Sequence, residues 1–181
     1  LMTAQVHGKY YASAYRGKAF HANVTAQTIP VVGANKALKF ALYNPLASGI
    51  MAEVISAEIG TVLVGLIVDT FGWYSTTYAS WAASGTATIG TVQSARIGDS
   101  PSNAVVFYSA ITLPNDSVVP IRVDTIGSHG ATGITGPVTT RKDYEGRLLL
   151  PPGQVIFVMA STTVSTTSGL DVMASWCEWP L

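Results

Sequence analysis

Histidine and cysteine are the residues of this chain best suited to metal binding or nucleophilic chemistry. The three histidines, His7, His21 and His129, stand far apart and in none of the spacings that place two imidazoles on one metal ion. Cys177 is the single cysteine, which excludes zinc-ribbon and iron–sulfur sites and an internal disulfide. We therefore expect no metal and no cofactor.

An adjacent serine and histidine, Ser128 and His129, could supply a nucleophile and its base. They lie in a glycine-rich stretch, the nearest acids in sequence are Asp124 and Asp143, and the chain has no Gly-x-Ser-x-Gly motif. A phosphate-binding loop of the Gly-x-x-x-x-Gly-Lys-Ser/Thr type is also absent. These patterns predict that the protein is not an enzyme. A site assembled from residues distant in sequence stays open as an alternative.

Paired carboxylates could perform general acid and base catalysis, as in glycoside hydrolysis. Glu53 and Glu58 are separated by five residues, which predicts that they lie on opposite faces of a strand. Asp143 and Glu145 would share a face, but three basic residues surround them, which is typical of a solvated charged turn. Neither pair predicts an active site.

Aromatic residues form the remaining candidate for binding chemistry. Exposed Trp and Tyr side chains stack on sugars, whereas buried ones anchor protein interfaces, and packing in the core is the simpler alternative. One hairpin-like region contains the candidate interface or glycan-binding residues Trp73, Tyr74, Tyr78 and Trp81.

The charges of the chain are few and unevenly distributed. Charged residues make up 11% of the 181 residues, against about 25% in an average globular protein, and the formal net charge is zero. The first 52 residues hold five basic and no acidic residues, and the rest hold five basic and ten acidic, giving +5 and −5. The basic residues of the first part are Lys9, Arg16, Lys18, Lys36 and Lys39.

This polarity predicts a basic end that docks on an acidic neighbour, with internal pairing of the two parts as the alternative. A weakly charged surface of zero net charge favours association, and the basic excess of a nucleic-acid binder is missing. We therefore expect protein partners and no nucleic acid. Reversing the charges of Lys9, Arg16 and Lys18 should weaken docking and leave folding intact.

The elements that must position these residues are strands almost throughout. Short runs rich in β-branched and aromatic residues alternate with turn clusters such as Asn44-Pro45 and Pro151-Pro152-Gly153. This spacing predicts an all-β antiparallel sandwich, jelly roll or barrel, and the best helical candidates, residues 35–40 and 44–52, are short and uncapped. The expected strands include residues 38–43, 54–68, 71–81, 86–97, 104–113, 118–125, 147–150, 155–162 and 170–179.

The last expected strand has two distinct faces. Leu170, Val172, Ala174 and Trp176 would share an apolar face, and the alternate residues form a mixed face. Such a strand packs one side on a core and the other on a neighbour. Deletion of residues 170–181 is therefore expected to unfold the domain.

Neither a membrane span nor a leader is expected from the sequence. The apolar run 59–68 is closed by Glu58 and Asp69 after ten residues, about half the length of a spanning helix. No three-part signal peptide is visible at the beginning of the sequence. We expect residues 1–35 to form a basic N-terminal arm or the first strands, and residues 36–181 a single jelly-roll-like sandwich.

The chain is neutral and weakly charged, is expected to be all-β, begins with a basic part and has a Pro-Pro-Gly turn before residues 155–160. In these features it resembles small jelly-roll decoration or cement proteins of tailed phages. The resemblance implies a homotrimer on the capsid surface of the virion. The major capsid protein would be its partner, and the trimer would stabilise the head by bridging capsid subunits. The alternative is a receptor- or carbohydrate-binding module, such as a phage fibre tip.

Overall fold

The structure is a computed structural model of the 181-residue chain. It describes residues 10–28, 36–38, 40–63, 69–77, 90–98, 102, 105–107, 111–113, 119–126, 139–160 and 169–181.

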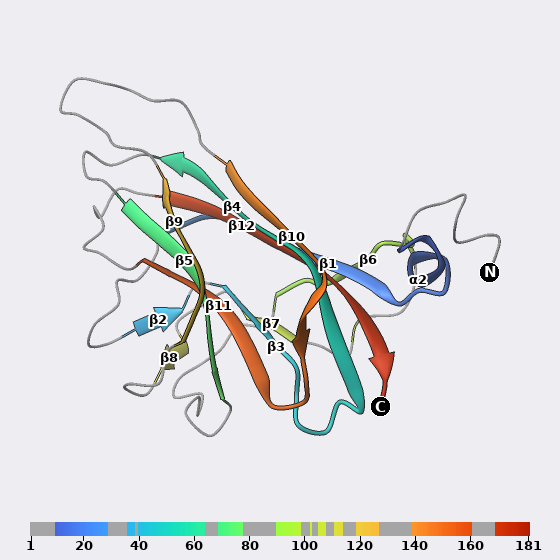
Figure 1. Ribbon diagram of the computed structural model, residues 1–181. Helices are drawn as coiled ribbons and strands as arrows, with labels where there is room; N and C mark the ends of the chain where they lie inside the picture. The colour runs from blue at the N-terminus through green and yellow to red at the C-terminus, as the bar shows by residue number, and fades with distance from the viewer. Residues whose placement is uncertain are drawn as a thin grey trace.

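The described residues form a β-sandwich of two five-stranded sheets with one short helix (Figure 1). One sheet, sheet A, has the order β10-β4-β12-β1-β6, and the other, sheet B, has the order β7-β3-β11-β5-β9. A small third sheet pairs β2 with β8. The elements are α2 (Tyr11–Tyr15), β1 (Ala19–Thr28), β2 (Lys36–Leu38), β3 (Ala41–Tyr43), β4 (Ile50–Leu63), β5 (Asp69–Thr77), β6 (Gln93–Ser94), β7 (Val105–Phe107), β8 (Ile111–Leu113), β9 (Val119–Ile126), β10 (Thr139–Leu150), β11 (Gln154–Ala160) and β12 (Gly169–Pro180).

The strand pairs are nested along the chain. β1 pairs with β12, β3 with β11, β4 with β10 and β5 with β9, and all four pairs are antiparallel. The predicted all-β antiparallel sandwich is therefore confirmed. This nested order makes neighbours of strands that are far apart in the sequence.

Both helical candidates from the sequence are wrong. Residues 36–38 form β2, and residues 44–52 form a turn followed by the start of β4. These residues form strands because partner strands are present in the sandwich. β2 pairs with β8, and β4 pairs with β12 inside sheet A.

The core lies between the two sheets and is rich in aromatic side chains. Phe20 of β1 stacks on Trp176 of β12, with ring centroids 6.1 Å apart. Phe40 meets Trp73 of β5 edge to face at 5.8 Å. All four side chains are almost fully buried, and such aromatic pairs stabilise beyond the area they bury.

Strand β12 occupies the centre of sheet A, between β4 and β1. Val172, Ala174 and Trp176 belong to the buried core, whereas Met173 and Ser175 on the other face are half-buried. The predicted division of this strand into two faces is confirmed for these residues. A central strand with an apolar face is bonded to neighbours on both sides, so it holds the sheet together.

A β-bulge in β4 changes the predicted orientation of its two glutamates. Val54 pairs with Trp176 of β12 and Ser56 pairs with Ser175, so Ile55 is an extra residue in the ladder. Core residues therefore fall at 52 and 54 before the bulge and at 57 and 59 after it. Glu53 and Glu58 both lie on the half-exposed outer face, and the prediction of opposite faces is wrong.

Two predicted turns carry the chain between the sheets. Between β10 and β11, Gln154 N donates to Pro151 O at 3.1 Å, and Gly153 has φ of 83°, the geometry that requires glycine after Pro152. Between β3 and β4, Asn44 begins the turn. Both turns were predicted from the Pro, Gly and Asn residues that form them.

The beginning of the described chain belongs to the sandwich. Residues 19–28 form β1, which lies between β12 and β6 in sheet A and contributes Phe20, Ala22 and Val24 to the core. Within residues 1–35, residues 19–28 are thus a strand of sheet A, and residues 1–9 and 29–35 lie outside the described residues. No helix among the described residues is long and apolar enough to cross a membrane.

Candidate functional site

Helix α2 is a five-residue turn of helix that is closed by a glycine. Gly17 adopts φ of 65°, its N–H donates to Ala14 O at 3.0 Å, and Lys18 N donates to Ser13 O at 2.8 Å. This is the Schellman pattern, for which glycine is favoured because a Cβ strains the left-handed conformation. The turn presents Arg16 and Lys18 as exposed residues before the chain enters β1.

Glu53 of β4 connects the beginning of the described chain to its last strand. Tyr10 donates its hydroxyl hydrogen to Glu53 Oε1 at 3.2 Å, and Trp179 Nε1 donates to Glu53 Oε2 at 2.8 Å. Charge-assisted bonds of this kind are stronger than neutral ones. The carboxylate therefore holds the start of α2 against sheet A.

Arg96, in the loop after β6, holds the other end of α2. Its Nη1 donates to Tyr15 O at 3.1 Å, and its guanidinium lies 6.0 Å from the centroid of the Tyr15 ring, within the range of a cation–π interaction. Tyr15 in turn stacks on Tyr11 one helical turn earlier, with centroids 6.1 Å apart. Ala95 N donates to Ala19 O at 2.8 Å, so the loop is bonded to β1.

Three cations and two tyrosines are thereby gathered on one surface. We name it the α2–β6 face and define it by Tyr11, Tyr15, Arg16, Lys18 and Arg96, all exposed. Within the described part of the chain, Arg16 and Lys18 form no ion pair. Arg16 and Lys18 are therefore exposed cations on this face.

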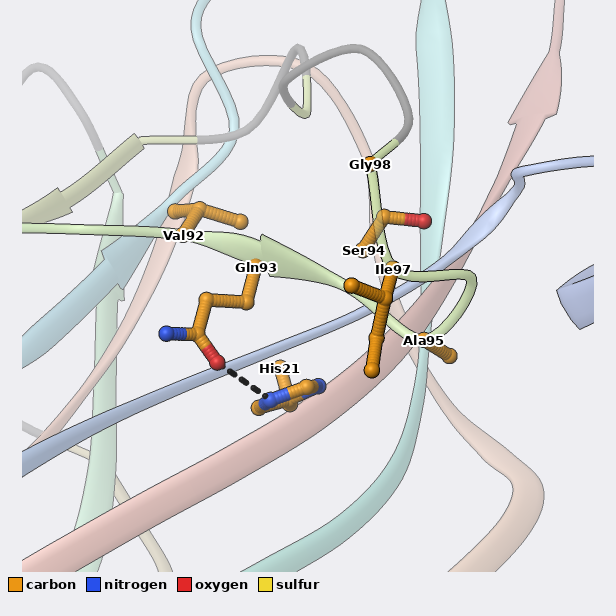
Figure 2. A pocket seen from close by; sticks show the side chains of 7 residues that line it. All are labelled: His21, Val92, Gln93, Ser94, Ala95, Ile97 and Gly98. Carbon is orange, nitrogen blue, oxygen red and sulfur yellow. Dashed lines mark hydrogen bonds between the residues drawn. The ribbon is translucent and has the colours of Figure 1, made fainter.

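A pocket adjoins the α2–β6 face on the β6 side (Figure 2). It is open, has a volume of about 570 Å³, and is lined by His21, Val92, Gln93, Ser94, Ala95, Ile97 and Gly98. His21 Nε2 lies 3.0 Å from Gln93 Oε1, and the amide oxygen accepts a hydrogen from the ring. Ile97 is 99% exposed on the pocket rim.

The described lining of the pocket offers polar groups of three kinds. It contains one imidazole, one amide and one hydroxyl, and no carboxylate among the described residues. Among the described residues, no group of three or more His, Cys, Asp or Glu side chains could hold a metal ion.

The exposed large hydrophobic side chains of the described residues belong to α2, to the loop after β6, to the turn between β3 and β4, and to the ends of β10 and β12. We name this region the apolar end. Its members are Tyr11, Tyr15, Leu46, Ile97, Leu149, Trp179 and Leu181.

Hydrogen bonds and strand pairing bring the elements that carry these side chains near one another. Leu181 N donates to Gly49 O at 3.1 Å, which places the last residue beside the turn that carries Leu46. Leu149 pairs with Glu53, the residue that binds both Trp179 and Tyr10. The remaining members belong to α2 or to the loop that Arg96 ties to it.

The predicted docking residues are only partly brought together. Arg16 and Lys18 lie on the α2–β6 face, whereas Lys36 lies in β2, away from α2 (Figure 1). Lys9 and Lys39 fall outside the described residues. Arg96 was missed because its contact with Tyr15 spans 81 residues, and no local pattern marks it.

The predicted aromatic site is not an exposed platform in its described part. Trp73 is 2% exposed and Tyr74 is 6% exposed, because β5 lies inside sheet B and both rings pack on other aromatics. These two residues therefore stabilise the fold and offer no face to a sugar. Tyr78 and Trp81 lie outside the described residues.

The acidic candidates do not form a catalytic pair. Asp143 makes an ion pair with Arg141 at 3.0 Å, and both side chains are more than half exposed. Asp143 and Glu145 belong to strand β10, where a charged turn was predicted. Glu178 is 2% exposed and accepts hydrogen bonds from Trp176 Nε1 and Ser102 Oγ, so its carboxylate is closed to an external substrate. Ser128 and His129 lie outside the described residues.

No protein-family model, no curated protein and no solved structure matches this chain. Its function therefore has to follow from the geometry of the described residues.

Proposed function

We propose that this protein is a structural virion protein, a decoration or cement protein that forms a homotrimer on a phage capsid and bridges capsid subunits. The apolar end is the observation that carries this proposal. Exposed apolar patches of this kind mark surfaces that contact other proteins, and here the patch lies on a weakly charged chain of zero net charge.

The hydrogen bonding of the elements that carry the apolar end supports a role in assembly. Its residues are borne by sheet A, by a turn bonded to the last residue and by a helix that Glu53 and Arg96 hold in place. A surface fixed before binding loses little conformational entropy when a partner docks on it. A cement protein requires such a preformed surface because it must match a rigid shell.

The apolar end has two sides, one with Leu46 and Leu149 and one formed by the α2–β6 face, and they suit two different partners. Near a threefold axis, equal patches of the three copies approach one another, which favours uncharged side chains such as Leu46 and Leu149. The cations of the α2–β6 face would repel their own copies there. We therefore assign Leu46 and Leu149 to contacts between copies and the α2–β6 face to the shell.

Two measurements test the proposed function. Light scattering after size-exclusion chromatography should give a mass of about 57 kDa, three times the 19.0 kDa of one chain. Phage heads that lack this protein should bind it on co-sedimentation and then resist heating or low salt better than bare heads. A monomer that does not bind heads would contradict the proposal.

Two of the four aromatic residues considered for carbohydrate binding cannot contact a sugar. Trp73 and Tyr74 are buried in the core, so a glycan platform would need other aromatics. A glycan array carried out beside the head-binding assay separates the two functions.

A further inference from the structure

We propose that the α2–β6 face and the adjoining pocket bind an acidic segment of the shell protein that also carries an apolar side chain. This inference rests on the proposed function and adds the chemistry of the partner and the place where it docks.

The charge of the α2–β6 face determines the charge of its partner. Arg16 and Lys18 are exposed on either side of Gly17, and Arg96 lies over Tyr15. Among the described residues, Glu53 is the acid hydrogen-bonded to the start of α2, and its two oxygens accept hydrogen bonds from Tyr10 and Trp179. Carboxylates of a partner therefore suit the exposed cations Arg16 and Lys18.

The pocket supplies the apolar and hydrogen-bonding part of the recognition. Val92 and Ile97 form apolar parts of its lining, and His21, Gln93 and Ser94 supply polar groups (Figure 2). A pocket with this mixture takes an apolar side chain while its polar groups bond the backbone of the same segment. Arg96 lies between Ala95 and Ile97 in sequence and bonds Tyr15 O, so the loop that lines the pocket is attached to the helix beside Arg16 and Lys18.

The loop that joins the two parts is bonded at several points. Ala95 N donates to Ala19 O at 2.8 Å, Arg96 N donates to Ser94 Oγ at 3.1 Å, and Arg96 Nη1 donates to Tyr15 O. These contacts fix the pocket relative to the cations. An extended acidic segment can therefore contact both without a rearrangement of the protein.

A double charge reversal, R16E/K18E, tests the inference with the full chain. Co-sedimentation with heads lacking this protein should show an affinity about tenfold lower than that of the unchanged protein at about 0.05 M salt. The difference should shrink at about 0.5 M salt, because screening weakens the attraction that the variant lacks. Circular dichroism and the melting temperature should stay unchanged.

The matched control is R141E/K142E, which reverses the same number of charges on β10. This strand is at the opposite edge of sheet A from β6, so the control alters net charge equally without altering the α2–β6 face. It removes the exposed Arg141–Asp143 pair, which contributes little to folding. Its head binding should equal that of the unchanged protein.

The outcomes separate the inference from the proposed function. Failure of the unchanged protein to bind heads would overturn both. Head binding that R16E/K18E leaves intact, or that both double variants weaken equally, would overturn the inference and leave the decoration function standing. Tight binding of a labelled single-stranded oligonucleotide, lost in R16E/K18E and competing with heads, would assign the face to nucleic acid and overturn it as well.

Discussion

Asn44 is the residue at which both turns between the sheets are held together. Its side-chain Nδ2 donates to Ile50 O at 2.9 Å and to Leu150 O at 2.8 Å, and the residue is fully buried. Its backbone N–H donates to Gln154 O, and its carbonyl accepts from Gly153 N. The side-chain amide therefore links the start of β4 to the end of β10, and the backbone of the same residue bonds the start of β11.

Replacing Asn44 with Ala should destabilise the protein by about 2 to 4 kcal/mol, because two buried carbonyls lose their donor. Chemical denaturation followed by circular dichroism measures this change. Asn23→Ala, at an exposed position of β1, is the control and should stay within about 0.5 kcal/mol of the unchanged protein. Equal effects of the two substitutions would show that the Asn44 bonds contribute nothing specific.

Glu53 offers a second test at the scale of single residues. Glu53→Ala removes the acceptor of Tyr10 and Trp179 and should lower stability by about 1 to 2 kcal/mol. Hydrogen exchange at the amides of residues 14 and 16–18 should quicken, because α2 loses its attachment to sheet A. Glu58→Ala, half-buried on the same face of the same strand, should leave these amides unchanged.

Turn residues were predictable from the sequence and the Glu53 contacts were not. Asn, Pro and Gly determine backbone geometry over three or four positions, so their effect is visible locally. The donors to Glu53 lie 43 and 126 residues away. Only the register of β4 and β12, including the bulge at Ile55, brings Trp179 to this carboxylate.

At the scale of elements, β12 is the strand on which sheet A depends. It is bonded along its length to β4 and, from 169 to 177, to β1, and it supplies Trp176 to the core. Deletion of residues 170–181 should therefore abolish the cooperative thermal transition and the near-ultraviolet circular dichroism. A truncated protein with a sharp transition would contradict this role.

A point substitution tests β12 without removing backbone hydrogen bonds. Trp176→Ala leaves a cavity beside Phe20 and should cost about 3 to 5 kcal/mol, measured by denaturant titration. The full-length variant is expected to keep the sandwich at low temperature.

The strands were predictable as elements because alternating apolar residues mark one buried face, as in β12. The first strand was harder to predict from the sequence, because residues 1–35 were expected to form either a basic arm or the first strands. Helix α2 was missed because five residues have little intrinsic helical stability. It exists through its Gly17 turn and its attachment to Glu53 and Arg96, which are tertiary contacts.

At the scale of the whole molecule, the low charge of the chain has a structural counterpart in the apolar end. Composition predicted that much of the surface faces other protein, which stays a prediction, and it could not indicate where the exposed apolar side chains lie. Their location depends on β4, β10, β12, α2 and the β6 loop being brought near one another through contacts distant in sequence. The basic character of the first 52 residues pointed to Arg16 and Lys18 but not to Arg96 or Ile97.

The assignment of Leu46 and Leu149 to contacts between copies leads to a test of assembly. Both side chains are more than half exposed, so L46N/L149N removes little buried apolar area from one chain and should leave the melting temperature of the monomer unchanged. In the trimer the same side chains would be desolvated, and their replacement by amides removes apolar burial at each of three equal contacts. Light scattering should then show a shift from about 57 kDa toward the 19.0 kDa of one chain as the protein is diluted.

The control for this variant is Arg141→Asn, an exposed position on the same strand as Leu149 but near its other end. It should leave the mass of the assembly unchanged. If L46N/L149N stays as fully assembled as the control, the copies meet through another surface. If it becomes monomeric yet still binds heads through Arg16 and Lys18 with reduced avidity, trimerisation and shell docking use separate sides of the apolar end.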